Sequence, residues 1–185
     1  MRLAIIHARE LATDPALLSE LERGALTAIR GERRRDEWIR GRLAIHRLLG
    51  PEISVLVDAD GAPRPLGGSP CSVSLSHDGG WFAVAVADGR SRIGIDLCRR
   101  SHGDRVARIL RWLGVRGEPI DPIVAWTALE AVLKLRRLSI EALRDRALDV
   151  EARNAHVVVR GIGDDAVVRW RTGAEHVVSW TREAA

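Results

Sequence analysis

The sequence predicts an α+β fold in which helices and antiparallel hairpins occur in both halves of the chain. First, the 185 residues are 46% hydrophobic and 29% charged, a soluble globular composition long enough for two small subdomains. Second, two long runs, near 32–49 and 121–137, carry apolar residues at helical spacing. Third, β-rich runs alternate with Gly- and Asp-rich turns. We place the subdomain boundary near residue 90, so the expected subdomains are 1–90 and 91–185.

Two helices are expected in the first half. Asp14 and Pro15 are typical of an N-cap followed by the first helical position, which predicts a helix to about residue 29. The second expected helix spans about 32–49 and stops at Gly50-Pro51. In the second half, helices are predicted near 103–113 and 121–137.

A hairpin is the clearest β signal. The runs 71–76 and 81–87 flank His77-Asp78-Gly79-Gly80, which predicts a turn that exposes His77. Proline and glycine between residues 62 and 70 predict a loop. The other predicted strands are residues 2–7, 53–57, 92–97, 148–153, 156–160, 166–171 and 177–181.

Charge and aromatic content argue against a nucleic-acid-binding protein. The net charge is +4 and the pI about 10.2, but the basic residues are scattered among 25 acidic ones. Aromatic platforms for single strands are scarce, since the chain has no tyrosine and one phenylalanine. The one dense arginine block suits a compact polyphosphate better than a duplex. It comprises Arg33, Arg34, Arg35, Arg40, Arg42 and Arg47.

Other features exclude further classes. Cys71 and Cys98 lack the paired spacing of a zinc or redox motif. No apolar stretch is long enough for a signal peptide or a membrane span, so we expect a cytoplasmic protein. All the basic residues are arginine except Lys134. A lysine that survives such a bias offers a compact ammonium, which a guanidinium cannot mimic.

Single motifs leave ordinary structural interpretations open. Asp96 ends a buried strand and could be a turn or capping residue. Glu130 and Lys134 lie four apart on a helix and could form a surface ion pair. His77 could be a turn histidine. Together, however, two carboxylates, a lysine, a histidine and an arginine cluster are the components of phosphoryl transfer around Mg²⁺.

Five motifs in order resemble the surfactin-type 4′-phosphopantetheinyl transferases. The three strongest are Ser-Val-Ser-Leu-Ser76-His77, Ile-Gly-Ile-Asp96 and Trp126-Thr-Ala-Leu-Glu130-Ala-Val-Leu-Lys134. Two earlier ones are Gly61-Ala-Pro-Arg-Pro65 and the helix with Arg34 and Arg42. The resemblance covers about residues 30–140. It implies two pseudo-twofold-related α/β subdomains, with the active site and coenzyme A in the cleft between them.

The resemblance also implies roles in binding coenzyme A. Arg34 and Arg42 are expected to hold the 3′-phosphate side of the nucleotide. Ser76 and His77 are expected to contact the phosphates near the 3′,5′-ADP leaving group, with His77 close to the chemistry. Lys134 is expected to neutralise phosphate charge.

The implied chemistry is transfer of the 4′-phosphopantetheine arm to a serine of an apo acyl or peptidyl carrier protein. Asp96 and Glu130 are the expected Mg²⁺ ligands. Glu130, directly or through a water, is expected to take the proton of the attacking serine. We expect a monomer. The carrier could serve fatty-acid, polyketide or peptide synthesis, that is, primary or secondary metabolism.

Two departures from the family pattern leave an alternative open. The family usually has an acidic residue where this chain has Cys98, and a lysine where it has Leu129. Arg99, Arg100 or Arg137 could replace the missing cation. The alternative is a catalytically degenerate member that binds coenzyme A or a carrier protein without transfer. Since carrier proteins are typically acidic, we expect a basic rim to attract them. The candidates are Arg99, Arg100, Arg105 and Arg108.

Overall fold

The computed structural model describes residues 1–68, 70–89, 91–117, 120–144 and 146–183. It contains four α-helices and three antiparallel sheets, which confirms the α+β prediction. The chain divides into two compact units, Met1–Ser91 and Arg92–Ala185. They are called the N-terminal and C-terminal units below, and each is described by itself. The pseudo-twofold relation stays a prediction.

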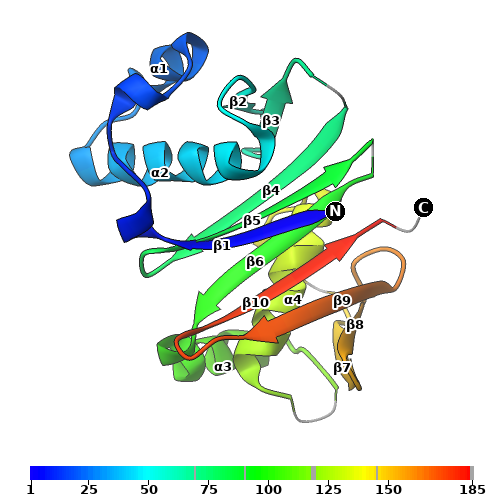
Figure 1. The fold of residues 1–185 in the computed structure, drawn as a ribbon. Coiled ribbons are helices and arrows are strands. Elements are labelled where there is room, and N and C mark those ends of the chain that lie inside the picture. Colours follow the sequence, from blue (N-terminus) through cyan, green and yellow to red (C-terminus); the bar gives the residue numbers. More distant parts are fainter. Residues whose placement is uncertain (69, 90, 118–119, 145, 184–185) are drawn as a thin grey trace. The chain divides into compact units, whose positions relative to one another are not determined.

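A three-stranded antiparallel sheet forms the base of the N-terminal unit (Figure 1). Its strands, in spatial order, are β1 (Arg2–His7), β5 (Trp81–Asp88) and β4 (Cys71–Asp78). The predicted hairpin is confirmed: Gly79 and Gly80 both have positive φ, at 57° and 83°, as a tight two-residue turn requires. His77 is exposed as predicted, but it lies in β4 opposite Phe82 rather than in the turn.

The predicted helix over residues 14–29 is wrong as a single element. Asp14 caps only a short 3-10 turn, η2 (Pro15–Leu17). The backbone is then extended at Ser19, which starts a new helix through a capping box with Glu22. That helix is α1 (Glu20–Leu26). A second short 3-10 turn, η1 (Ala8–Glu10), follows β1.

The second predicted helix is confirmed as α2 (Glu32–Leu49). It lies along one face of the β1-β5-β4 sheet (Figure 1). The core between them is formed by apolar side chains of α2 and of all three strands, including Ala44, Ile45, Val73, Phe82, Val84 and Val86.

The prediction of a loop throughout residues 62–70 is wrong in part. Residues Pro63–Leu66 form β3, which pairs with β2 (Ser54–Val57) in a two-stranded sheet. Pro63 and Pro65 are tolerated because each strand of such a sheet has one unpaired edge. The two prolines therefore made a strand harder to predict from the sequence, but they do not prevent it from forming.

The C-terminal unit is a five-stranded antiparallel sheet covered by helices. The predicted strands are confirmed as β6 (Ile93–Arg99), β10 (His176–Arg182), β9 (Ala166–Thr172), β8 (His156–Arg160) and β7 (Asp149–Arg153), in spatial order. The helical elements are η3 (Arg100–His102), α3 (Gly103–Trp112), α4 (Pro122–Arg136) and η4 (Ile140–Leu143). The helix α4 packs on β6 and β10, and α3 packs on α4 (Figure 1).

A glycine sets the distance between β6 and α4. A Cβ atom at Gly94 would lie 1.9 Å from the backbone oxygen of Ala131 and 2.8 Å from the backbone nitrogen of Leu135. Both clashing atoms belong to the backbone of α4, so no side-chain movement could relieve the contact. Only glycine lets the strand and the helix approach this closely.

Candidate functional site

Asp96 and Lys134 meet where β6 crosses α4 in the C-terminal unit. Side chains alternate along a strand, so Asp96 shares the face of Gly94, which is turned to α4. The ammonium Nζ of Lys134 donates to Oδ1 of Asp96 at 2.7 Å. Asp96 is buried and Lys134 is partly buried. The close approach at Gly94 therefore brings the last turn of α4 within reach of the strand carboxylate.

Glu130 is the second carboxylate of this cluster. It lies one helical turn before Lys134, on the same side of α4. Burial raises the pKa of Glu130 above its ordinary value, and the negative charge of Asp96 raises it further. The charge of Lys134 offsets part of this shift. The cluster of Asp96, Glu130 and Lys134 thus holds two carboxylates whose mutual repulsion is only partly neutralised.

A buried hydroxyl pair lies beside this cluster. Ser179 of β10 is the cross-strand partner of Asp96. Its Oγ lies 2.7 Å from Oγ1 of Thr127, which is on α4 one turn before Glu130. Both side chains are fully buried. The pair ties β10 to α4 and thereby helps to hold Asp96 opposite Glu130.

The two departures from the family pattern have different structural settings. Cys98 is buried on the same face of β6 as Asp96. Its Sγ lies 3.7 Å from the backbone oxygen of Arg99 and 3.9 Å from Nδ1 of His102. Leu129 is fully buried in the core of the C-terminal unit. A lysine at 129 would therefore put its ammonium among apolar side chains, so residue 129 has no place in the polar cluster.

The arginines proposed as replacements have other contacts. Nη2 of Arg99 lies 3.1 Å from Nε2 of His102. Arg100 pairs with Asp121 at 3.4 Å, and its Nε donates to the backbone oxygen of Gly173. Arg137 is exposed in the left-handed conformation that ends α4. That one of these arginines replaces the missing lysine stays a prediction.

Arg42 is the most unusual predicted site residue of the N-terminal unit. It is 3% exposed, and its guanidinium carbon lies 4.5 Å from the ring centroid of Trp38. Its Nε has no hydrogen-bond partner within the part of the chain that the structure describes. Burial lowers the pKa of Arg42 to about 10, although the charge of Glu22 acts in the opposite direction. A buried guanidinium with an unused N–H suits an anionic ligand.

The other predicted phosphate contacts lie on α2 and β4. Arg34 is exposed near the start of α2, eight residues before Arg42 on the same helix. Ser76 is buried and His77 is exposed in β4, where the His77 ring stacks on Phe82 with 5.4 Å between centroids. As neighbours in one strand, Ser76 and His77 point to opposite faces. They therefore contact a common ligand only if it passes the end or the outer edge of β4, the edge strand of this sheet.

Sequence reasoning missed the positioning role of Gly94, Thr127 and Ser179. Gly94 carried a usable signal, because a glycine inside a buried strand often marks a close backbone approach. The Thr127–Ser179 pair had no such signal, because its partners are 52 residues apart in sequence.

Within the described residues, no helix combines the length and the apolar composition of a membrane span.

Comparison with known proteins shows a similarity to a 4′-phosphopantetheinyl transferase. No protein-family model matches the sequence. Over 114 residues the chain is 30% identical to the 4′-phosphopantetheinyl transferase AcpT of Salmonella typhimurium. That match covers 56% of this chain and 59% of the relative, so the chain spans less than two thirds of that protein's length. The similarity agrees with the resemblance at the level of 4′-phosphopantetheinyl transferases, while the surfactin-type subgroup stays a prediction.

Proposed function

We propose that this chain transfers the 4′-phosphopantetheine arm of coenzyme A to a serine of an apo carrier protein. The observation that carries the proposal is the cluster of Asp96, Glu130 and Lys134, two carboxylates and a lysine held together by β6 and α4. The distant relationship to a 4′-phosphopantetheinyl transferase supports the same reaction.

The donor set of the cluster fits a magnesium ion. Asp96 and Glu130 supply hard carboxylate oxygens, which Mg²⁺ prefers, and their repulsion is the kind that a divalent cation relieves. When bound, Mg²⁺ would neutralise charge on the pyrophosphate of coenzyme A. The sulfur of Cys98 is too soft to be a good third ligand.

Side chains of this protein accept the proton and stabilise the phosphate charge during the reaction. Glu130 accepts the proton of the attacking serine hydroxyl, and its raised pKa makes it a stronger base than an ordinary carboxylate. The serine oxygen forms a bond to the β-phosphorus of coenzyme A. The bond from that phosphorus to the bridging oxygen breaks, and 3′,5′-ADP leaves. Lys134 stabilises negative charge on the phosphates during this step.

Nucleotide binding is the proposed role of the N-terminal residues. Arg34 and Arg42 contact the 3′-phosphate, and the unused N–H of buried Arg42 supports this role. Ser76 and His77 contact the phosphates near the leaving group. An Arg42→Met variant should therefore lose affinity for coenzyme A more than for its 3′-dephospho form. Equal losses for the two ligands would contradict the assignment.

The exposed side of α3 is the proposed contact for the carrier. Val106 and Leu110 of this helix are buried, while Arg105, Arg108 and Trp112 are exposed on its other side, Trp112 at 70%. A basic surface with one large aromatic side chain suits an acidic helical partner. The double variant Arg105→Glu, Arg108→Glu should raise KM for the carrier and leave the affinity for coenzyme A unchanged.

The alternative is a degenerate family member that binds coenzyme A or a carrier without transfer. Cys98 in place of a carboxylate favours it. Leu129 in place of a lysine is the second departure, but its position lies in the apolar core. Two readouts separate the alternatives: calorimetry with coenzyme A, and intact mass of a panel of apo carriers after incubation with coenzyme A and Mg²⁺. Transfer predicts a gain of one phosphopantetheine. Coenzyme A binding without a mass gain on any carrier would favour the degenerate binder.

A further inference from the structure

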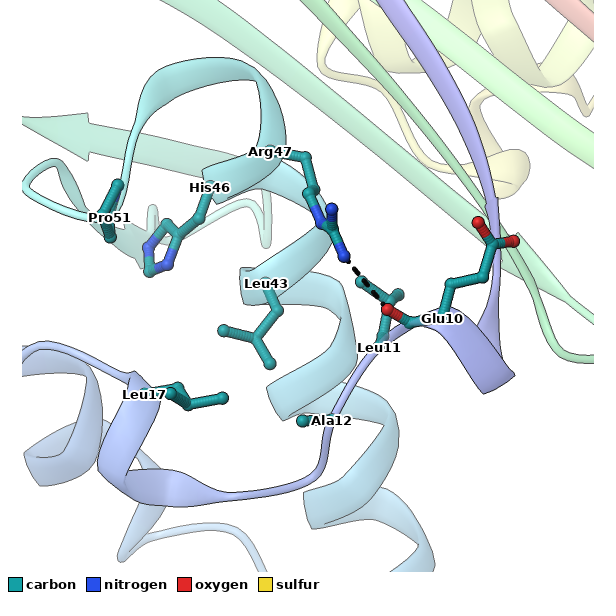
Figure 2. A pocket seen from close by; sticks show the side chains of 8 residues that line it. All are labelled: Glu10, Leu11, Ala12, Leu17, Leu43, His46, Arg47 and Pro51. Carbon is teal, nitrogen blue, oxygen red and sulfur yellow. Dashed lines mark hydrogen bonds between the residues drawn. The ribbon is translucent and has the colours of Figure 1, made fainter.

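A second candidate binding site lies wholly within the N-terminal unit. It is a pocket of about 360 Å³ between α2 and the segment that joins β1 to α1. Five apolar residues form most of its wall: Leu11, Ala12, Leu17, Leu43 and Pro51 (Figure 2). Its volume falls near the lower end of small-molecule sites, about 300–1,000 Å³. The occupant is therefore limited to a small molecule with a largely apolar body.

A buried histidine is the polar group of this wall. The ring of His46 points from α2 into the space among Leu17, Leu43 and Pro51 (Figure 2). The side chain of His46 is 5% exposed. Its Nδ1 has no hydrogen-bond partner among the described residues. A buried polar atom without a partner is uncommon, and Nδ1 can accept a hydrogen bond from a water molecule in the pocket.

Glu22 fixes the orientation of this histidine. It is fully buried, and its Oε1 lies 3.0 Å from Nε2 of His46 and 2.9 Å from the backbone nitrogen of Val55. Its Oε2 accepts from the backbone N–H of Ser19. Burial alone would raise the pKa of Glu22, but these hydrogen bonds, led by that of His46, hold it below its ordinary value. The carboxylate is therefore ionised, Nε2 carries a proton, and Nδ1 is the unused nitrogen.

A positively charged side chain, that of Arg47, lies at the rim of the same pocket. Arg47 is exposed, and its Nη2 donates to the backbone oxygen of Glu10 at 3.2 Å, the bond drawn in Figure 2. The carboxylate of Glu10 points away from the pocket (Figure 2) and accepts from the backbone N–H of His7. Arg47 is therefore the charged group closest to a ligand at the rim, and its other N–H groups can bind an anion.

From these features we infer that the pocket binds a small amphipathic carboxylate. Its hydrocarbon chain packs on the apolar wall, and its anionic end pairs with Arg47. The inference is independent of the proposed transfer reaction, because the pocket is lined only by residues 10–51 and uses none of Arg34, Arg42, Ser76 or His77.

The test is titration calorimetry of the full chain with octanoate, and separately with 1-octanol, which has the same chain length and no charge. We expect saturable one-to-one binding of octanoate and weaker binding of the alcohol. Arg47→Gln should weaken octanoate binding about tenfold, the effect of one exposed charge-assisted hydrogen bond. The matched control is Arg9→Gln, which changes an exposed arginine outside the pocket and should leave the affinity unchanged.

Two further variants test the location. Ala12→Trp fills the pocket from an exposed position and should abolish binding. Leu17→Ser removes part of the apolar wall at a residue that is 52% exposed, so it tests the same point if Ala12→Trp does not fold. The inference is overturned if octanoate does not bind saturably, if octanol binds equally well, or if the pocket variants bind like the unmodified chain.

Discussion

Replacing Gly94 with alanine tests the packing that brings Asp96 to Lys134. The added Cβ would lie 1.9 Å from the backbone oxygen of Ala131. An ordinary contact of this kind is at least 3.4 Å, so β6 and α4 must separate by about 1.5 Å. Overpacking a well-filled core commonly costs about 1–3 kcal/mol. Because both neighbours here are backbone atoms, we expect a loss of about 3 kcal/mol or more in the free energy of unfolding.

The measurement is urea denaturation followed by circular dichroism, with Gly103→Ala as the matched control. Gly103 begins α3, and a Cβ there meets no atom within 4 Å. Its substitution should be neutral or slightly stabilising, by up to about 1 kcal/mol. If Gly94→Ala were as stable as Gly103→Ala, the close approach of β6 to α4 could not be what positions the cluster.

Three further substitutions have distinct expected outcomes. Leu129→Lys buries an ammonium in the apolar core, so it should destabilise the fold by at least about 3 kcal/mol. The control Leu129→Met should cost less than about 1.5 kcal/mol. Equal denaturation midpoints for the two variants would contradict the buried position of residue 129. The pKa of Glu130 is raised on folding, so its ionisation opposes folding as the pH rises. Glu130→Gln should therefore increase thermal stability at pH 7, with the increase fading as the pH falls below the ordinary glutamate pKa; a lower melting temperature at pH 7 would refute this. Folding lowers the pKa of Glu22, so its ionised carboxylate stabilises the fold at pH values above the ordinary glutamate pKa. This stabilisation disappears as the pH falls through the lowered pKa of the folded state. Glu22→Gln should destabilise at neutral pH by about 1–3 kcal/mol, and melting curves that stay equally far apart at every pH would count against the role of the carboxylate.

Local sequence signals predicted much of the fold. Gly79-Gly80 marked the hairpin because two successive positive φ angles are easy only for glycine. The apolar spacing in α2 and α4 predicted both helices. The helix expected over residues 14–29 failed because the capping box at Ser19 outweighed the earlier start signal at Asp14. The strand β3 was missed because its prolines opposed it and the pairing with β2 depends on tertiary context.

The site was only partly predictable, because some of its contacts join segments that are far apart in the sequence. Glu130 and Lys134 lie on one helix, so their spacing alone placed them together. Their approach to Asp96 depends on Gly94 and on the Thr127–Ser179 pair, which join segments far apart in the chain. Leu129 looked like a lost cation in the sequence. Its burial shows that this position belongs to the core.

Transfer of phosphopantetheine is tested most directly by intact-mass analysis of an apo carrier protein incubated with coenzyme A and this chain. We expect a gain of one phosphopantetheine with Mg²⁺, none with a chelator, and none with Asp96→Asn at any Mg²⁺ concentration. The variant Asp164→Asn, which changes an exposed carboxylate between β8 and β9, should retain the activity. A mass gain that survives Asp96→Asn or the chelator would contradict the proposed metal site, and no gain on any carrier would contradict the transfer itself.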